Sequence, residues 1–285
     1  MMKYLNLGCG QRFHSVWTNI DFTSTSDGVI ACNLTKGIPY PNSSFDVVYS
    51  SHVLEHFPKT KAKSFLEECY RVLRPQGVIR IAVPDLEQIA KTYLQSLEQA
   101  SFGSLEWANN YNWILLEMYD QTVRNYSGGE MAKYLFDEHI PNQEFVLQRL
   151  GIEAENLFKA RNRGKQEKPL IADTEGRLKH LLRQIYRFVR YPNHHRESIL
   201  KLLLGKEYET LQIGRFRQSG EVHQWMYDRY SLALLLKKCG LDKIIPRTAS
   251  ESYISNWTNF NLDTELDGTV YKPDSLFMEG IKLAK

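Results

Sequence analysis

The chain has 285 residues, of which 42% are hydrophobic and 24% charged, and its formal net charge is +3. This composition is ordinary for a soluble globular chain, and no segment approaches the ~18 consecutive apolar residues that span a bilayer. The first residues lack the apolar stretch of a signal peptide, so we expect a cytoplasmic protein. The four cysteines form no C-x-x-C pair, and we therefore predict reduced thiols and no metal site.

The first predicted strand, residues 4–7, turns sharply on two glycines, Gly8 and Gly10. Residues without a Cβ atom let the backbone come close to a nucleotide-type ligand. A second predicted strand, residues 17–21, ends in Asp21, whose carboxylate can accept two hydrogen bonds from ribose hydroxyls. Only ten residues separate Gly10 from Asp21, so we expect no full helix between these strands.

Further strands are predicted at residues 29–32, 44–51 and 78–83, with a helix at residues 61–73 between the last two. Strands that alternate with helical runs indicate a parallel sheet that binds ligands at its carboxyl edge. A helix at residues 228–239 and two strands, near Ile244 and between Leu276 and Ile281, would complete this sheet.

Between the fifth strand and the late helix lie residues 85–222, which are too many for a loop. We predict a core made of residues 1–84 and 223–285. The intervening residues 85–222 form a large, mainly helical insertion that covers the carboxyl edge of the sheet.

Four motifs in this order carry a family resemblance. They are L-N-L-G-C-G at residues 5–10, N-I-D at residues 19–21, N-L-x-x-x-I-P-Y-P-N-S-S-F-D-V-V-Y-S-S-H-V-L-E-H-F at residues 33–57 and E-C-Y-R-V-L-R-P-Q-G at residues 68–77. Together they resemble the class I S-adenosylmethionine-dependent methyltransferases of the type 11-like branch, and within it bacterial enzymes associated with surface-polysaccharide biosynthesis. The resemblance covers residues 3–84 and resumes at residues 228–241.

The resemblance implies an α/β fold: a Rossmann-like sheet of seven strands, mostly parallel, flanked by helices. It also implies roles for matching positions around S-adenosylmethionine. Asn6, Gly8, Cys9 and Gly10 would line the methionine end, and Asp21 would hold the ribose. Asn33 and Leu34 would flank the adenine, while Ser50, Ser51 and His52 would lie along the methionine and the sulfonium.

Two of these positions depart from the family. Asn6 and Asn33 stand where acids are common, and an amide supplies no charge for the ammonium group or the adenine amine. With the short connection after Gly10, this predicts weak cofactor affinity or partial exposure of the cofactor.

Methyl transfer to a hydroxyl calls for a general base, typically a histidine or a carboxylate. The candidates are His52 and Asp85, which follow the fourth and fifth strands, and His223, which lies where the insertion rejoins the core. Each also has a structural alternative: His52 could position the cofactor, and Asp85 could cap the helix that follows. In the segment around His223, Trp225 and Tyr227 could stack on a sugar ring or pack in the core.

The insertion contains a basic segment, residues 159–206, with thirteen Lys and Arg against four Asp and Glu, so its net charge is +9. Arg183, Arg187 and Arg190 share one face of a predicted helix. This is either a solvated face or an anion site for a phosphate-linked glycan, a nucleotide-sugar or an anionic membrane surface. A nucleic-acid partner is not expected, because no known binding module is visible.

A second segment mixes aromatic and amide side chains, at residues 255–263. It is either a carbohydrate-contacting loop or a hairpin extension that closes the sheet edge.

The sequence thus predicts a methyltransferase that uses S-adenosylmethionine and methylates an oxygen of a sugar or glycan intermediate. One alternative is a methyltransferase for N, S or phenolic O of small metabolites. Another is a non-catalytic S-adenosylmethionine-binding partner of a glycosyltransferase. A dinucleotide dehydrogenase is disfavoured, because the spacing from Gly10 to Asp21 is shorter than the ~20 residues expected there.

Overall fold

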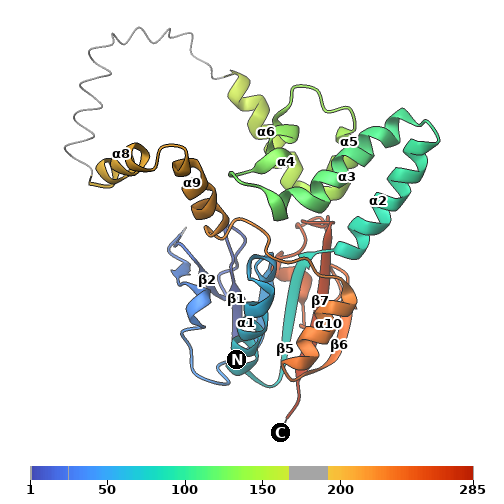
Figure 1. Ribbon diagram of the computed structural model, residues 1–285. Coiled ribbons are helices and arrows are strands. Elements are labelled where there is room, and N and C mark those ends of the chain that lie inside the picture. Colours follow the sequence, from blue (N-terminus) through green and yellow to red (C-terminus); the bar gives the residue numbers. More distant parts are fainter. Residues whose placement is uncertain (1, 25, 167–191, 285) are drawn as a thin grey trace.

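The computed structural model describes residues 2–24, 26–166 and 192–284. Its centre is a sheet with the strand order β3-β2-β1-β4-β5-β7-β6, seen in Figure 1 below a group of helices. The strands are β1 Tyr4–Leu7, β2 Thr18–Asp21, β3 Val29–Ala31, β4 Phe45–Ser51, β5 Leu73–Pro84, β6 Leu241–Arg247 and β7 Ser275–Lys282.

The pairing of the strands confirms the predicted fold class. Strands β1 to β5 pair in parallel, and β7 runs antiparallel between β5 and β6. Because β1 lies beside both β2 and β4, the strand order reverses direction there, and ligands of open α/β sheets bind beyond the carboxyl ends at such a point. The Rossmann-like arrangement therefore directs attention to the residues that follow β1, β2 and β4.

Helices cover one face of the sheet. They are α1, Lys59–Val72, and α10, Arg229–Lys238. Their apolar sides, with Phe65, Leu66 and Leu232 among them, pack on side chains such as Leu5 and Leu7 of β1 in the largest buried cluster. Residues two apart on a strand point to the same face, so this cluster uses one set of alternate positions along the strands.

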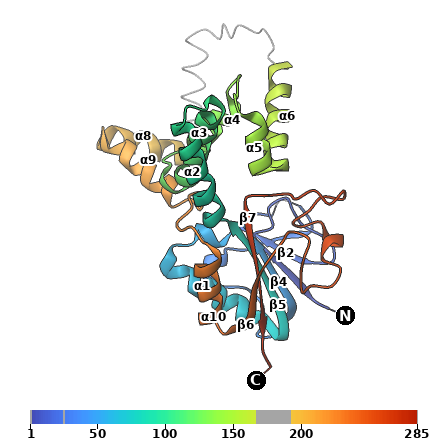
Figure 2. The same ribbon diagram turned by 90° about the vertical axis from the view of Figure 1, so that its right-hand side faces the viewer.

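Among the described residues, no long helix covers the opposite face. Trp257 and Phe260, in the short 3-10 helix η3 (Trp257–Phe260), pack with Trp17 and Tyr49 on this face. Figure 2 shows the segment between β6 and β7 on the side of the sheet away from α1 and α10. The prediction of a hairpin extension for residues 255–263 fits this position better than a sugar-contacting loop, because Trp257 is buried.

A buried ion cluster lies on that second face. Arg80 of β5 is fully buried and pairs with Asp263 at 2.8 Å and with Glu279 at 2.9 Å. Its guanidinium also lies 4.6 Å from the centre of the Trp257 ring. Removing one member of such a group leaves a buried charge without a partner. Because Asp263 belongs to the segment between β6 and β7 and Arg80 to β5, the cluster ties this segment to the sheet.

The connection between β1 and β2 contains only turns, as predicted from its length. Asn6 contributes to its shape, because its Nδ2 donates to the backbone oxygen of Arg12 at 3.1 Å and to Asn19 Oδ1 at 3.2 Å. The amide that departs from the family pattern therefore has a structural role, since its N–H groups hold the connection that replaces a helix.

The described part of the insertion is mainly helical. Its helices are α2 Leu86–Ser101, α3 Leu105–Val123, α4 Gly129–Phe136, α5 Gln143–Leu150, α6 Ile152–Gln166, α8 Pro192–Leu204 and α9 Glu207–Arg217. Helices α3 to α6 share a buried cluster of their own around Trp113, and the group lies over the carboxyl edge of the sheet (Figures 1 and 2).

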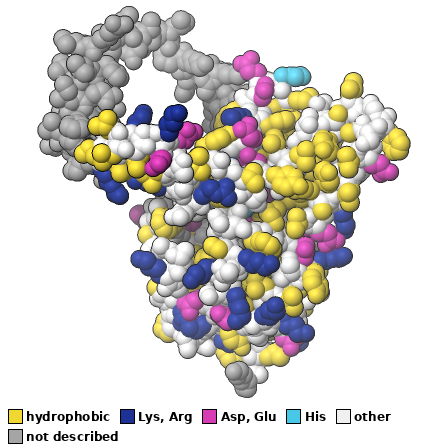
Figure 3. Space-filling model, viewed as in Figure 1, with side chains coloured by type: hydrophobic (Ala, Val, Ile, Leu, Met, Phe, Trp, Pro, Cys, Tyr) yellow, Lys and Arg dark blue, Asp and Glu magenta, His cyan; other side chains and the backbone are white. Residues whose placement is uncertain are grey.

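On the outer surface of the insertion, apolar side chains gather over α2 and α3 (Figure 3). Phe102 and Leu105, at the turn between these helices, are 82% and 83% exposed. Among the described residues, no helix has both the length and the apolarity that crossing a bilayer demands.

Candidate functional site

The turn after β1 requires glycine at two positions for different reasons. Gly8 and Gly10 both have positive φ, +67° and +54°, which glycine adopts without strain. A Cβ atom on Gly8 would lie 2.1 Å from Val53 Cγ2, whereas a Cβ atom on Gly10 would meet nothing within 4 Å. Gly8 therefore serves close packing, and Gly10 leaves open the space in front of the turn.

Asp21 stands beside this turn at the end of β2. Its Oδ2 accepts a hydrogen bond from the backbone N–H of Gly10 at 2.7 Å. Its side chain is half-buried. The glycine turn and the Asp21 carboxylate, which we predicted to bind the same ligand, are thus adjacent in space.

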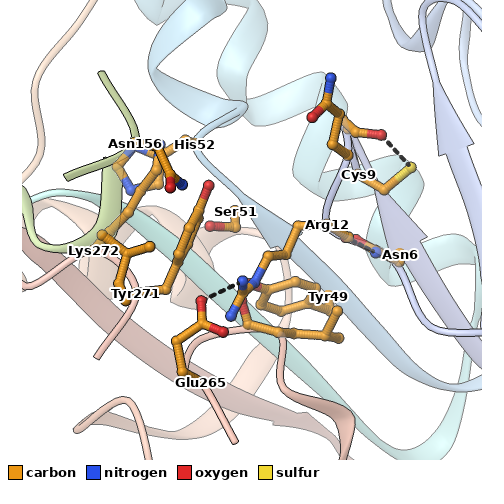
Figure 4. A pocket seen from close by; sticks show the side chains of 15 residues that line it. Asn6, Cys9, Arg12, Tyr49, Ser51, His52, Asn156, Glu265, Tyr271 and Lys272 are labelled. Atoms are coloured by element: carbon orange, nitrogen blue, oxygen red, sulfur yellow. Dashed lines mark hydrogen bonds and ion pairs between the residues drawn. The ribbon is translucent and has the colours of Figure 1, made fainter. Parts of the chain in front are cut away.

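A first cavity of about 400 Å³ opens in front of the turn, a volume within the range of ligand pockets. Figure 4 shows its side chains around the central space. It is lined by Asn6, Gly8, Cys9, Gly10, Gln11, Arg12, Tyr49, Ser51, His52, Ile152, Asn156, Leu262, Glu265, Tyr271 and Lys272. Six of the predicted cofactor residues, Asn6, Gly8, Cys9, Gly10, Ser51 and His52, therefore meet in one place.

Four other predicted cofactor residues lie outside this lining: Asp21, Asn33, Leu34 and Ser50. Asn33 caps the short 3-10 helix η1, Leu34–Lys36, through its Oδ1, and Leu34 faces a separate hollow beside Phe57. Ser50 is buried in β4. The cavity thus matches the methionine end of the expected site, and an adenine group would extend past Asp21 toward η1.

Arg12 closes the first cavity from the side where a helix is absent. Its guanidinium donates to Glu265 Oε1 at 2.7 Å and to the backbone oxygen of Thr264 at 2.6 Å, and it lies 4.0 Å from the centre of the Tyr271 ring. The pair with Glu265 is drawn in Figure 4. We did not predict these wall residues, because nothing in the local sequence links Arg12 to a segment near the other end of the chain.

His52 occupies a constrained position at the end of β4. Its φ is +52°, unusual for a residue with a Cβ atom and often a mark of a functional site. Its Nε2 is 2.8 Å from Ser275 Oγ and its Nδ1 is 3.4 Å from Oε1 of the buried Glu55. With Nδ1 protonated toward the carboxylate, Nε2 carries the lone pair that could accept a proton.

A second cavity, of about 500 Å³, lies between the core and the insertion. It shares two wall residues, His52 and Lys272, with the first cavity. Its other walls come from both parts of the chain: His56, Pro84, Glu117, Gln121, Arg124, Gly128, Met131, Ala132, Leu135, Phe136, Leu150, Glu153, Leu157, Glu221, His223 and Asp274. The two cavities therefore meet at His52.

Four carboxylates and two Lys or Arg side chains line the second cavity. Glu153 pairs with Lys272 at 3.2 Å, and Glu221 pairs with Arg124 at 3.3 Å. Glu117 pairs with Arg149, whereas Asp274 Oδ1 is buried without a hydrogen-bond partner among the described residues. Carboxylate oxygens accept hydrogen bonds only, so this cavity suits a ligand that presents several donors, such as hydroxyl groups.

The other two candidate bases differ in position. Asp85 accepts hydrogen bonds from the backbone N–H groups of Glu87 and Gln88 at the start of α2, and it lines neither cavity. The structure therefore favours its capping role. His223 lines the second cavity, but burial lowers its pKa to about 3, which makes it a weak base at neutral pH.

The aromatic residues near His223 also take different places. Tyr227 is buried in the core cluster, and Trp225 is half-exposed with Lys59 Nζ 4.0 Å from its ring centre. Trp225 and Tyr227 line neither cavity, so their positions give no support for sugar stacking.

The structure does not describe residues 167–191 of the predicted basic segment, residues 159–206. Arg183, Arg187 and Arg190 lie outside the described residues. At the start of the segment, Lys159 pairs with Glu155 at 3.0 Å on the surface of α6. The proposed anion site therefore stays a prediction.

Comparison with known proteins agrees with this geometry. The family model described as a methyltransferase domain matches residues 5–81, which run from β1 into β5. A probable S-adenosylmethionine-dependent methyltransferase of Mycolicibacterium smegmatis is 42% identical over 48 residues, 17% of this chain and 18% of that protein. The match spans less than a fifth of that relative's length.

Solved structures give weaker likenesses. A SAM-dependent methyltransferase from Archaeoglobus fulgidus has 12% identity and a TM-score of 0.38, covering 99% of this chain and 86% of that chain. The 1,6-didemethyltoxoflavin-N1-methyltransferase of Burkholderia thailandensis, solved with S-adenosylhomocysteine, has 19% identity and a TM-score of 0.25, covering 30% and 45%. The fold assignment rests on the strand order, and the match of residues 5–81 supports S-adenosylmethionine as the cofactor.

Proposed function

We propose that the chain is an S-adenosylmethionine-dependent methyltransferase that methylates a hydroxyl oxygen of a sugar or glycan intermediate. The observation that carries the proposal is the junction of the two cavities at His52. One cavity is built on the glycine turn of a methyltransferase domain, and the other is rich in hydrogen-bond acceptors. A donor and an acceptor bound in them would meet beside one histidine.

The residues of the first cavity fit the cofactor. The space in front of Gly10 is open, and Asp21 stands at the adjacent strand end, where its Oδ1 lies 3.5 Å from the backbone nitrogen of Thr23. Gly8, Cys9 and Gly10 would hold the methionine end and Asp21 the ribose. When bound, S-adenosylmethionine supplies a methyl group activated by a sulfonium.

The residues of the chain would contribute alignment and proton transfer. The second cavity would hold the acceptor with a hydroxyl facing the first, and alignment of this kind is worth ~7–11 kcal/mol in favourable intramolecular cases. The proton of the acceptor hydroxyl would pass to His52 Nε2, and the acceptor hydroxyl would take the place that the Ser275 hydroxyl now occupies beside this nitrogen. Glu55 then stabilises the charged ring through Nδ1.

The first experiment is calorimetric titration with S-adenosylmethionine and S-adenosylhomocysteine, with NAD as the control. We expect binding of both sulfur nucleotides and none of NAD. An acceptor screen then compares nucleotide-linked and lipid-linked sugars with free phenols. Turnover on phenols alone would favour a small-metabolite enzyme, and binding with no turnover on any acceptor would favour a non-catalytic partner of a glycosyltransferase.

His52→Gln tests the assigned base. General-base catalysis typically contributes ~10²–10⁴-fold, so kcat should fall by that factor. Affinity for S-adenosylhomocysteine should change by less than about threefold, because the substitution removes proton transfer in the transition state and leaves ground-state binding in place. The control is His139→Gln, at an exposed histidine of the insertion. An unchanged kcat in His52→Gln would remove His52 from the mechanism.

A peripheral membrane contact is a further part of the proposal. Support comes from the net charge of +9 in residues 159–206 and from the exposed Phe102 and Leu105 at the turn between α2 and α3. Binding to vesicles with anionic lipids should weaken as salt rises. If the protein sediments equally with neutral and with anionic vesicles at all salt concentrations, an electrostatic contact is contradicted.

A further inference from the structure

Three side chains near the second cavity form a compact set of metal-ligand types. One ligand atom from each of Glu55, His56 and His223 lies within 4.8 Å of the others. Glu55 and His56 belong to the 3-10 helix η2, Leu54–His56, and His223 comes from the segment that leads out of the insertion. Ligand atoms bound to one zinc-type ion are ~3–3.5 Å apart, so small side-chain rotations would bring these three to bonding distance.

The backbone holds the two segments together. The N–H groups of Gln224 and Trp225 donate to the backbone oxygen of Glu55 at 2.7 and 3.2 Å, and that of His223 donates to Gln121 at 2.9 Å. His223 is thus fixed between η2 and α3. A site built on such contacts is preorganised, as metal sites in stable folds are.

The second observation is a set of buried polar atoms that lack hydrogen-bond partners among the described residues. Glu55 is 0% exposed. Neither of its carboxylate oxygens, nor Nδ1 of His56 or of His223, has a hydrogen-bond partner in the described part of the chain. A buried carboxylate without partners is costly, and Nδ1 of His52 lies 3.4 Å from Oε1 of Glu55. Four such atoms in one place require a cation or donors to satisfy them.

The His56 ring has the arrangement of a metal ligand. It makes a hydrogen bond to the backbone of Val222, while its Nδ1 is left without a partner among the residues that the structure describes. Ligating histidines regularly use one ring nitrogen for such a support and the other for the metal. Arg124 and Lys272 also face this region, but each is paired with a carboxylate, which limits their repulsion of a cation.

We propose that Glu55, His56 and His223 bind one divalent transition-metal ion of the zinc type. Two imidazoles and one carboxylate are the ligands of several catalytic zinc centres and of non-haem iron sites, which keep open positions for other ligands. Because His56 and His223 line the second cavity, an open position there would face the acceptor. We predicted no metal site from the cysteines, and this site uses none.

Residues 52–56 also spell H-x-x-E-H, the spacing that one class of zinc peptidases places on a helix. Here the segment passes through the left-handed His52 and a single 3-10 turn. His52 therefore reaches Ser275 and is not part of the cluster. The third ligand comes instead from His223.

The test uses the full chain, purified without a histidine tag and dialysed against EDTA. Titration with Co²⁺ should give visible absorption bands that saturate at one equivalent and disappear on addition of Zn²⁺. His56→Ala and His223→Ala should each weaken Co²⁺ binding by ~100-fold or more. His139→Ala, at the exposed histidine, should bind as the wild type does.

Circular dichroism distinguishes a variant that has lost the metal site from one that has lost the fold. If either alanine variant unfolds, Glu55→Gln replaces it in the titration, because glutamine is close in shape to glutamate. Substoichiometric Co²⁺ binding by the wild type, or equal binding by folded His56, His223 or Glu55 variants, would overturn the proposal. The titration needs neither cofactor nor acceptor, so its result is independent of the proposed methyltransferase activity.

Discussion

Replacing Gly8 by alanine separates the two reasons for glycine in the turn. The new Cβ atom would lie 2.1 Å from Val53 Cγ2, whereas carbon atoms in contact are ~3.5–4.0 Å apart. Overpacking of this kind costs ~1–3 kcal/mol, and the left-handed backbone adds ~1–2 kcal/mol. We therefore expect the free energy of unfolding of Gly8→Ala to fall by about 2–5 kcal/mol, out of the ~5–15 kcal/mol of a typical domain.

Gly10→Ala is the matched variant at the other end of the turn. Its φ is also positive, but no atom lies within 4 Å of the new Cβ. Only the backbone cost of ~1–2 kcal/mol applies to stability. The methyl group would enter the first cavity, so affinity for S-adenosylhomocysteine should fall by ~10-fold or more.

Urea unfolding and calorimetry measure the two effects, and a double-mutant cycle isolates the contact. Adding Val53→Ala to Gly8→Ala removes the Cγ2 atom, which should recover ~1–3 kcal/mol as a coupling energy. If the cycle shows no coupling, the close packing of Gly8 on Val53 is refuted. If Gly10→Ala binds S-adenosylhomocysteine as the wild type does, the first cavity is not the cofactor site.

Three further predictions follow from other parts of the fold. Arg80→Met removes the buried cation from Asp263 and Glu279, and of these two carboxylates only Glu279 keeps an ion pair among the described residues, with Arg247. Urea unfolding should therefore show a loss of ~3–5 kcal/mol, whereas Lys91→Met, in an exposed pair, should change stability by less than ~1 kcal/mol. Similar effects of both substitutions would contradict the burial argument. Burial, assisted by the charge of Asp21, raises the pKa of the Cys9 thiol to about 11. The rate of Cys9 alkylation, measured by peptide mapping, should therefore be low at pH 7.5 and rise about tenfold per pH unit up to that pKa. Rapid labelling of Cys9 at pH 7.5 would refute the raised pKa. Arg12→Ala removes the contacts that hold the segment after Leu262, so calorimetry should show ~10-fold weaker binding of S-adenosylhomocysteine. An unchanged affinity would mean that Arg12 is not part of the wall of the site.

The parts of the site that local sequence could predict are the turn and the strand ends. The strand Tyr4–Leu7 has the predicted bounds, because its apolar residues and the glycine that ends it are adjacent in the chain. His52 was placed at the open edge for the same reason. The positions of this strand and of His52 depend on residues that are adjacent in the chain, so a single sequence is enough to predict them.

Walls that come from distant segments could not be predicted in this way. Tyr271 and Lys272 reach the first cavity only because β7 pairs with β5 and brings their loop over the sheet edge. The Glu55, His56 and His223 cluster needs the insertion to return His223 to η2. Neither association leaves a spacing or a periodic pattern in the sequence.

The aromatic segment between β6 and β7 compensates for the helix that is absent after β1. Where no helix follows β1, the second face of the sheet must be covered by something else, and Trp257 and Phe260 take that place. A composition of aromatic and amide side chains serves this covering role as well as it would serve sugar binding, so composition alone could not separate the two.

The same segment also builds a wall of the first cavity. From Leu262 to Lys272 it continues past the covered face to wall the first cavity, where Arg12 holds it. Loss of the Arg80 ion cluster would therefore loosen the cavity wall as well as the core, because Asp263 lies beside Leu262 in the chain. We therefore expect the stability of the second face and the affinity for the cofactor to be coupled in this chain, whereas a helix after β1 would have kept them separate.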